Sequence, residues 1–538
     1  MMLSVYIRTI FVSWFFLLAW LILVPHSHSG EIPTLQEKTK TVQKMVREMR
    51  DSGKPLPQEV VGELQKARNA RENKDWPVLE RSLDRIINFF SNKSYAEEPT
   101  LKKETNEILK GADERIEKYR MGTAKLTIVT AAGQPVSSSI VNIKQTKHEF
   151  LFGINSNHII WSFYIAKKYG SHSLHPNFYK RLKKLKITNS QVENYMEKFF
   201  NIATYTSLPV WWRFYEPEKE NISYKIYDKE IEYLHNNGLK VLAHNLVWNN
   251  YVPPWIPDDC DSISMAVKKR TKAFISYYQG KFDYFIVFNE AANPFRPIFE
   301  KVSMTKCFKE IGKVPFVSMP FKVCREVDPY AKLMINEVAV SENQGFPELL
   351  RGLTDEKNNK LYDVIGIQSH MHKRIWPLDN VWKLCEFYSS FNVPIHFTEV
   401  SVLSGTPISG KNYGSKSTRE GELKQKEYAV ELYTVLFSHP SVEAIQWWDL
   451  TDLGSWKGAP AGLLRKDMSP KPAYKALMNL IREKWWTTVE TETSSQGKCE
   501  FKGFFGDYDI TVIQKNGQTR TFTIKLAKEG KREYRLIL

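Results

Sequence analysis

The spacing of hydrophobic positions changes along the chain, and each change predicts a different kind of structure. From about Glu31 to Lys118, apolar residues such as Val42, Val46 and Leu83 recur at helical intervals among many charges. This spacing is typical of amphipathic helices. From Ala124 the apolar residues alternate as in strands. The pattern therefore predicts a helical accessory segment that precedes the strand-containing part of the chain.

Two short strand-rich pieces flank a long central region. The first contains LTIVTAAGQPV, and the second contains CEFKGFFGDYDITV followed by a hairpin signal at Asn516-Gly517. Neither piece has enough strands to form a stable sandwich alone. Together they resemble the two halves of a transthyretin-like or carboxypeptidase-regulatory-like β-sandwich. We therefore predict that the central region is inserted into a small β-sandwich that both segments build.

Short apolar runs alternate with amphipathic helical patterns throughout the central region, which predicts an α/β fold. Helical patterns such as 227–236, 267–279 and 424–437 separate the runs. Eight strand–helix alternations over this length indicate a (β/α)₈ TIM barrel. The eight candidate strands are 148–153, 199–203, 240–247, 284–289, 332–336, 364–369, 394–398 and 444–448.

These patterns divide the chain into five parts. The predicted parts are a signal peptide (1–29), a helical accessory segment (30–122), the first half of the sandwich (123–147), the barrel (148–485) and the second half of the sandwich (486–538).

The first residues have the order of an export signal. Arg8 precedes an apolar run from Ile10 to Val24, and a small polar stretch then ends with a cleavage site expected after Ser29. The run is short for a membrane-spanning helix. We expect an exported protein (secreted, periplasmic or on the cell surface), and membrane attachment only if this segment stays uncleaved.

Charge and cysteine content limit the partners. The formal net charge is +16, but no basic strip with interleaved aromatics is present, so we do not expect nucleic-acid binding. The five cysteines lack metal-ligand spacing and are odd in number, so no disulfide pairing can be predicted. We expect a monomer without a metal or cofactor, whose partner is a polysaccharide or oligosaccharide substrate.

The predicted strands of the barrel end in reactive side chains. Glu290 ends the fourth strand and Glu399 the seventh, and active sites of such barrels lie at these carboxyl ends. Two carboxyl groups across a barrel mouth are what glycoside cleavage requires, since one protonates the leaving oxygen while the other attacks the anomeric carbon. The pair predicts a glycosidase.

Five motifs in the same region resemble glycoside hydrolase family 10, the barrel xylanases. FIVFNEAANPF resembles the acid/base motif of the family around Glu290, and IHFTEVSV resembles its nucleophile motif around Glu399. AHNLVWNN, VIGIQSHMH and WWDLTDLGSW resemble the motifs of the third, sixth and eighth strands. The resemblance runs from about 148 to 481 and identifies the chain as a divergent member of the family.

The resemblance implies further roles at matching positions. Asn289 would bind the 2-hydroxyl of the sugar being cleaved, His370 would orient Glu399, and Gln368 would lie nearby. His244 would contact the same sugar. The remaining substrate-binding candidates are Trp448, which would pack on that sugar, and Trp248 and Trp456, which would line the cleft.

Several positions depart from the family pattern. Thr206, Ser207 and Val210 stand where the family carries a Glu-Asn pair and then a Lys, groups that hold the next sugar on the non-reducing side. Asn249 replaces a usual His, and Asp449 a usual Gly. The lost hydrogen bonds put plain xylan in doubt as the substrate, because each is worth about 0.5–3 kcal/mol.

The expected function is therefore that of a retaining glycoside hydrolase, an endo-1,4-β-xylanase or close relative, that acts on xylan or a related β-glycan. A barrel hydrolase for a different β-glycan is the nearest alternative. A glycan-binding protein on a degenerate barrel is a second, although binding alone would not need both Glu290 and Glu399. An envelope or structural protein is a third.

Overall fold

The computed structural model describes residues 32–51, 58–93, 107–156, 164, 167–168, 187–222, 224–338, 340, 345–406 and 416–538. The predicted signal peptide lies outside these residues. The chain forms two compact units, Met1–Glu104 and Thr105–Leu538. Within the described ranges, no helix is both long and apolar enough to cross a membrane.

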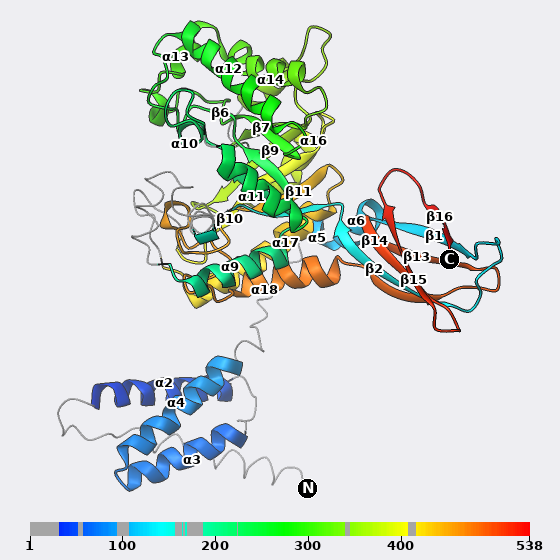
Figure 1. The fold of residues 1–538 in the computed structure, drawn as a ribbon. Coiled ribbons are helices and arrows are strands. Elements are labelled where there is room, and N and C mark those ends of the chain that lie inside the picture. The colour runs from blue at the N-terminus through cyan, green and yellow to red at the C-terminus, as the bar shows by residue number, and fades with distance from the viewer. Residues whose placement is uncertain are drawn as a thin grey trace. The chain divides into compact units, whose positions relative to one another are not determined.

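The first unit contains three helices, α2 (Ile32–Asp51), α3 (Gln58–Glu72) and α4 (Trp76–Lys93) (Figure 1). Their apolar stripes meet in a small core that includes Val42, Leu64 and Leu83, as the helical spacing predicts. Lys38 on α2 also reaches two acidic residues of α4, Glu80 and Asp84, at 2.7 and 2.9 Å. The expected helical accessory segment is present.

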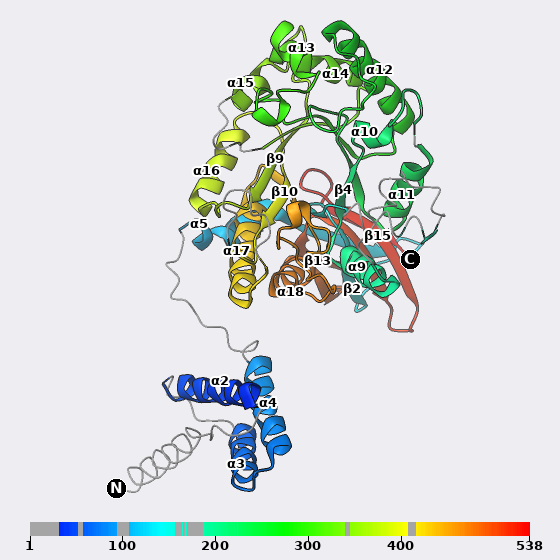
Figure 2. The ribbon, with the colours of Figure 1, turned by 90° about the vertical axis from the view of Figure 1, so that its left-hand side faces the viewer.

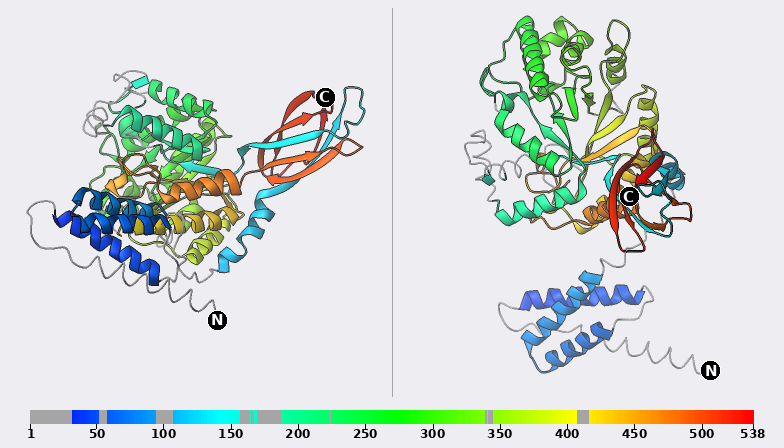
Figure 3. Two further views of the ribbon diagram at one scale, coloured as in Figure 1. Left: turned by 90° about the horizontal axis from the view of Figure 1, so that it is seen from below. Right: turned by 45° about the vertical axis from the view of Figure 1, so that its right-hand side comes forward.

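The two strand-rich pieces form one sandwich of two sheets. Strand β1 (Met121–Val129) pairs with β13 (Lys498–Phe504) and β16 (Glu533–Ile537). Strand β2 (Ile140–His148) pairs with β12 (Thr488–Glu492) and β14 (Gly506–Ile513), and β15 (Thr519–Leu526) pairs with β14. Figure 3 shows strands from the two ends of the second unit side by side, cyan and red. The predicted sandwich is confirmed, whereas the domain boundaries stay a prediction.

The central region folds as a closed parallel barrel with helices around it, which confirms the expected fold class (Figure 2). Strands β5 and β6 both pair with β7, so the nine described strands occupy eight positions. The strands are β3 (Leu151–Ile154), β4 (Tyr205–Pro209), β5 (Lys240–His244), β6 (Val247–Trp248), β7 (Tyr284–Asn289), β8 (Leu333–Glu337), β9 (Val364–Met371), β10 (Ile395–Val402) and β11 (Val442–Trp447). The longer helices around the barrel are α9 (Asn189–Ile202), α11 (Tyr224–Asn236), α12 (Cys260–Tyr278), α14 (Lys313–Val327), α15 (Gly345–Gly352), α16 (Leu378–Ser389), α17 (Arg419–Ser438) and α18 (Pro472–Asn479).

One predicted strand is wrong. Residues 199–203 are not a strand, because Phe199 to Ile202 form the last turn of α9 and the second barrel strand is β4. A capping box at Thr188 and Gln191 starts this helix, and its buried residues Val192, Tyr195 and Phe199 continue a helical period. The other seven predicted strands overlap observed ones.

An apolar layer closes the barrel below its mouth. Successive strands contribute inward residues to a buried cluster that includes Leu242, Ile286, Met334, Val364 and Ala444. The polar strand ends beyond this layer therefore remain for the site.

The sandwich and the barrel share buried contacts. Helix α6 (Ala112–Arg120) leads into β1, and the guanidinium of Arg120 donates to the backbone oxygens of Phe437 and Val442 at 2.6 and 2.7 Å. In addition, Cys260 and Cys307 form a disulfide between α12 and α13 (Thr305–Glu310), a pairing that cysteine spacing does not predict.

Candidate active site

The carboxyl-terminal parts of six barrel strands bring most of the predicted residues together. Asn289 ends β7 and Glu290 follows it, while Glu399 lies in β10. Gln368 and His370 lie in β9, and the remaining predicted residues are His244 at the end of β5, Trp248 in β6 and Trp448 after β11. Hydrogen bonds or ring contacts link each of these residues except Trp248 to another of them, and Trp248 contacts the rings of Trp211 and Tyr251.

Glu399 is buried and receives several polar contacts. Its side chain is 5% exposed, and Asn336 Nδ2 donates to Glu399 Oε1 at 2.9 Å. His370 Nε2 lies 2.9 Å from Glu399 Oε2, and His244 Nε2 lies 4.0 Å from Oε1. These contacts fix the direction of the carboxylate before substrate arrives.

Side-chain amides connect the two carboxyl groups. Asn336 Nδ2 also donates to Asn289 Oδ1 at 2.8 Å, and Gln368 Nε2 donates to Glu290 Oε1 at 3.2 Å. Thr398 Oγ1 in turn donates to Asn336 Oδ1 at 2.7 Å. Asn336 and Gln368 lie between the two carboxyl groups. The position of Glu290 relative to Glu399 therefore depends on the hydrogen bonds of these two amides.

Glu290 has an unusual backbone and a charged partner. Its φ of 55° lies in the left-handed region, which non-glycine residues adopt only when neighbouring structure imposes it. Its amide donates to Asn336 O at 2.9 Å. The guanidinium of Arg296, six residues further along the same loop, donates to Glu290 Oε2. The acid/base candidate is thus an ion-pair partner in the free protein.

A chain of hydrogen bonds continues behind His370. Its Nδ1 lies 2.7 Å from Ser401 Oγ, and Ser401 Oγ lies 3.0 Å from His372 Nε2. A consistent proton arrangement for neutral imidazoles has His370 Nε2–H donating to Glu399, Ser401 donating to His370 Nδ1, and His372 Nε2–H donating to Ser401. Such a chain fixes the tautomer of His370 that serves Glu399.

Burial controls the protonation of these groups. It raises the pKa of Glu399 to about 7, although the field of His244 and the Asn336 bond lower it. Burial lowers the pKa of His370 and of His372 to about 3, so both rings are neutral near pH 7. Burial likewise raises the pKa of Glu337 to about 8; this carboxyl accepts from Ala292 N at 2.8 Å and supports the loop that carries Glu290.

Aromatic rings surround the carboxyl groups. Trp448 lies 5.4 Å from the ring centroid of His244 and 5.7 Å from that of His370. Trp456 stacks on His370 at 4.4 Å, and both carboxylate oxygens of Asp449 accept from Trp456 N. Asp449, a departure from the family pattern, therefore holds a predicted cleft residue in place.

The other departures are buried. Thr206, Ser207 and Val210 are each 0% exposed, and Asn249 is 1% exposed. They therefore present no accessible polar group to a sugar. Beside them Trp211 stacks on Tyr251 at 4.6 Å and 1°, and lies 6.1 Å from Trp248. Aromatic faces replace the polar groups on this side of the mouth.

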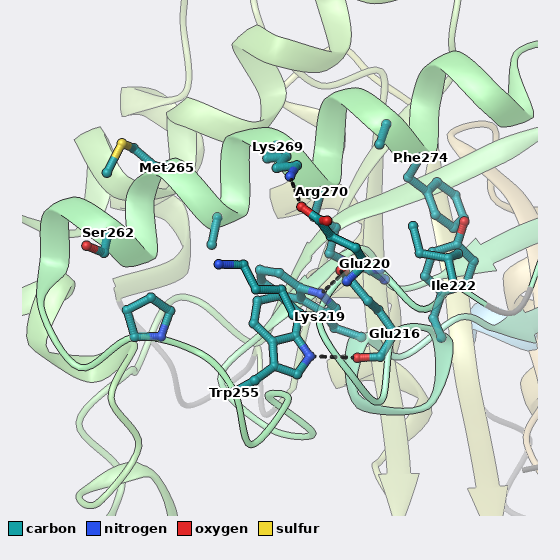
Figure 4. Close-up of a pocket in the computed structure, with 15 residues that line it drawn as sticks. Glu216, Lys219, Glu220, Ile222, Trp255, Ser262, Met265, Lys269, Arg270 and Phe274 are labelled. Atoms are coloured by element: carbon teal, nitrogen blue, oxygen red, sulfur yellow. Dashed lines mark hydrogen bonds and ion pairs between the residues drawn. The ribbon is translucent and has the colours of Figure 1, made fainter.

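A separate cavity lies between the β4–α11 loop and α12, away from the predicted residues (Figure 4). Several of its polar groups are paired with each other: Trp255 Nε1 donates to Glu216 O at 3.0 Å, and Lys269 pairs with Glu220 at 2.6 Å. Among the described residues, no group of three or more His, Cys, Asp or Glu could hold a metal ion.

Sequence reasoning missed five residues of the site. They are Arg296, Asn336, Glu337, His372 and Ser401. Asn336 and Glu337 end the fifth strand, so the strand-end rule could have found them. Ser401 and His372 lie two residues beyond Glu399 and His370, on the same strand faces. No comparable signal marks Arg296, which lies in a loop.

Comparison with known proteins adds a family match and several relatives. The model of glycosyl hydrolase family 10 matches residues 162–480. The anti-sigma-I factor RsgI6 of Acetivibrio thermocellus is 24% identical over 422 residues, which cover 77% of this chain and 48% of that protein. The chain thus spans about half the length of this relative.

Two xylanases are also similar. Endo-1,4-beta-xylanase B of Thermotoga neapolitana is 26% identical over 307 residues, 54% of this chain and 84% of that enzyme. The crystal structure of xylanase 10B from Thermotoga petrophila in complex with xylobiose is 22% identical with a TM-score of 0.49, and the match covers 62% of this chain and 95% of that one.

Proposed function

This chain belongs to glycosyl hydrolase family 10, and from that premise we propose that it is a retaining glycoside hydrolase that cleaves xylan or a related β-glycan. The observation that carries the proposal is the pair Glu290 and Glu399 at the ends of β7 and β10. Asn336 and Gln368 link the two carboxyl groups through hydrogen bonds. A protein that only binds glycans does not need such a pair.

In the first step Glu399 attacks the anomeric carbon while Glu290 gives its proton to the glycosidic oxygen. The bond to the leaving sugar breaks as the ester bond to Glu399 forms. In the second step Glu290, now a carboxylate, takes a proton from water, and the water oxygen attacks the same carbon. The ester bond breaks, Glu399 returns as a carboxylate, and two inversions leave the anomeric configuration retained.

Unsatisfied donors support substrate contacts at the predicted positions. Asn289 Nδ2, His244 Nδ1 and Trp248 Nε1 are buried and have no hydrogen-bond partner among the described residues. We propose that Asn289 binds the 2-hydroxyl and that His244 contacts the same sugar. Buried donors without partners are costly, and a sugar hydroxyl that displaces the side chains covering them would satisfy them.

The aromatic residues would shape the cleft. Trp448 would pack on the sugar being cleaved, and Trp248 and Trp456 would line the cleft, since sugar rings have apolar faces. His370 would orient Glu399 through the 2.9 Å contact.

A non-catalytic glycan-binding protein is the second candidate. One observation favours it: Arg296 already donates to Glu290, so the carboxyl group that would act on the leaving oxygen is held in an ion pair. Both candidates predict glycan binding, but only the enzyme predicts turnover that depends on Glu290 and Glu399.

The test is release of reducing sugar from a panel of β-glycans by the purified chain and by E290Q and E399Q. E490Q is a matched control, since Glu490 is an exposed residue of β12 in the sandwich. We expect turnover by the parent and E490Q, and a loss of about 10²–10⁴-fold or more in the two site variants. Binding of a glycan without turnover would favour the second candidate.

Stereochemistry tests the double displacement separately. In a time course followed by ¹H NMR, the first product should have the β configuration of the substrate. The inverted α anomer appearing first would contradict the proposed role of Glu399.

Export is a further part of the proposal. The export signal lies outside the described residues, and it is the sequence order around Ile10–Val24 that supports export. Cell fractionation with an antibody to the chain should find it in the medium, the periplasm or on the cell surface. Retention in the cytoplasm would contradict the proposal.

A further inference from the structure

Arg296 lies beside Glu290 but is not one of the site residues that the sequence predicts. It follows Glu290 by six residues, precedes the short helix η3 (Pro297–Phe299) and is 24% exposed. Its guanidinium carbon lies 4.6 Å from the ring centroid of Phe299, and one terminal nitrogen donates to Glu290 Oε2. Its buried Nε–H has no hydrogen-bond partner among the described residues. The guanidinium thus retains donor capacity beyond the bond to Glu290.

The ion pair conflicts with the first catalytic step. Arginine stays protonated at any working pH, and the guanidinium of Arg296 occupies one oxygen of the Glu290 carboxyl group. Glu290 has to carry a proton before it can donate one to the leaving oxygen. The leaving oxygen and Arg296 therefore compete for the same carboxyl group, and a second anion beside Arg296 would release Glu290 from the ion pair.

The substrate is the natural source of that anion. Glu290 acts on the leaving oxygen, so the neighbouring Arg296 faces the leaving-group side of the cleft. The same loop exposes Phe295 and Ile298, which are 54% and 68% accessible and suit the apolar face of a sugar chain. A planar carboxylate on that sugar chain matches the forked donors of a guanidinium.

A second cation lies on the other side of the carboxyl pair. Lys457 Nζ is 4.2 Å from the ring centroid of Trp456, and Trp456 stacks on His370. Neither cation is needed to bind a neutral glycan. Together with the net charge of +16, they favour an acidic chain over an uncharged one.

We propose that Arg296 is a specificity-determining residue that binds the carboxylate of a uronic-acid substituent on the glycan, so that uronate-substituted xylan is preferred over neutral xylan. The inference rests on the proposed function. On binding, the uronate replaces Glu290 as the partner of Arg296, Phe299 keeps the guanidinium in place, and the Glu290 carboxyl group becomes free to meet the leaving oxygen. No covalent step is added to the reaction.

The test compares glucuronoxylan with the same polymer after its carboxyl groups have been reduced to alcohols. This chemical change removes the charge and keeps the backbone. For the parent we expect kcat/KM to be at least about tenfold higher on the acidic polymer, the range of one charge-assisted contact. The preference should shrink between about 50 and 500 mM NaCl, because salt screens partly exposed charges.

Variants assign the preference to Arg296. R296Q should bring the kcat/KM values for the two polymers within about twofold of each other. R296K should keep an intermediate preference, because lysine retains the positive charge but lacks the paired N–H donors of a guanidinium. The matched control is R351Q. Arg351 also lies over a ring, that of Phe391 at 5.7 Å, but it belongs to α15 outside the mouth, so the parental preference should persist.

Two outcomes would overturn the assignment: equal rates of the parent on both polymers, or a preference that R296Q retains. Failure of the proposed function would look different, since the parent would then turn over neither polymer. In that case binding of the two polymers to parent and R296Q, measured by affinity gel electrophoresis, decides the question. Loss of the preference for the acidic polymer in R296Q would support the assignment, and equal binding of both polymers by the parent would reject it.

Discussion

The two sides of the barrel mouth hold their side chains in different ways. The carboxylate side consists of Asn289, Glu290, Asn336, Gln368, His370 and Glu399. The aromatic side consists of Trp211, Trp248 and Tyr251 above the buried Thr206, Ser207 and Val210. On the carboxylate side several hydrogen bonds fix each group, whereas on the aromatic side ring packing fills the space.

The difference teaches which part of the site tolerates change. An acid and a nucleophile work only within narrow limits of distance and direction, so several bonds over-determine their positions. A surface that holds a sugar can use flat rings in place of polar groups, because sugar rings present apolar faces. Three of the departures from the family pattern, Thr206, Ser207 and Val210, accordingly lie on the aromatic side, where they affect substrate binding more than the chemical step.

The largest effect beyond the carboxyl groups themselves is expected for Asn336. N336A removes the donor shared by Asn289 and Glu399, and loss of one preorganised donor costs about 10²–10³-fold in kcat. KM should change little, because Asn336 is buried behind both groups. Steady-state kinetics on the glycan that the parent cleaves measures this effect.

A suitable control for N336A is N194A, since Asn194 lies on α9 and its hydrogen bonds are local, to Ser190 and from Lys198 at 3.4 Å each. The control should keep parental kinetics. A decrease of less than about threefold in N336A would mean that the amide network does not organise the carboxyl pair.

The pH dependence of kcat/KM provides a second test of the carboxylate side. Burial raises the pKa of Glu399 to about 7, and the nucleophile must be ionised. As pH falls through 7, the ionised fraction falls, so kcat/KM should decrease about tenfold per unit below that point. Because the Asn336 bond lowers this pKa, N336A should move the acidic limb to higher pH.

Initial rates between about pH 4 and 9 test this expectation. A limb centred near 4.3, the value of an unperturbed glutamate, would show that water or substrate offsets the burial of Glu399.

Sequence patterns predicted the carboxylate side better than the aromatic side, for physical reasons. A parallel barrel delivers every strand end to one mouth, so Glu290, Glu399 and His370 could be found from strand position alone. Asn336 obeys the same rule, since it lies among the last residues of β8 before the mouth. Arg296 could not have been found, because its position depends on the path of a loop that no periodicity describes.

Fold prediction shows the same division. Pattern analysis located seven barrel strands from short apolar runs and the two halves of the sandwich from alternating apolar residues, since each of these faces a core. It failed at 199–203, where a short apolar run fits either a strand or a helix end. The burial of Thr206 and Val210 could not be predicted either, because it depends on how β4 turns its residues against its neighbours.

A smaller effect is expected from the aromatic side. W211A removes the ring that stacks on Tyr251 and lies 6.4 Å from His244. A lost ring contact is worth about 0.5–1.5 kcal/mol, so KM should rise about 2- to 10-fold while kcat changes less. W76A is the matched control, since Trp76 is 42% exposed on α4. A decrease confined to kcat would show that Trp211 acts in the chemical step. The aromatic side would then not be a substrate-binding surface alone.

The smallest effect is expected for Thr206, whose hydroxyl is buried and has no hydrogen-bond partner among the described residues. T206V replaces that hydroxyl with a methyl group of similar size, so it should stabilise the fold by about 1 kcal/mol and leave kcat/KM within twofold. The neighbouring Ser207 provides the contrast. Its Oγ donates to Asn155 Oδ1 at 2.9 Å and accepts from Gln446 Nε2 at 2.8 Å.

S207A would leave two buried groups unsatisfied and should destabilise the fold by about 1–3 kcal/mol. Chemical denaturation compares the two variants. If T206V were as destabilising as S207A, or reduced kcat/KM strongly, Thr206 would have a polar partner in the working enzyme. The aromatic side would then bind sugar through a hidden polar group as well as through its rings.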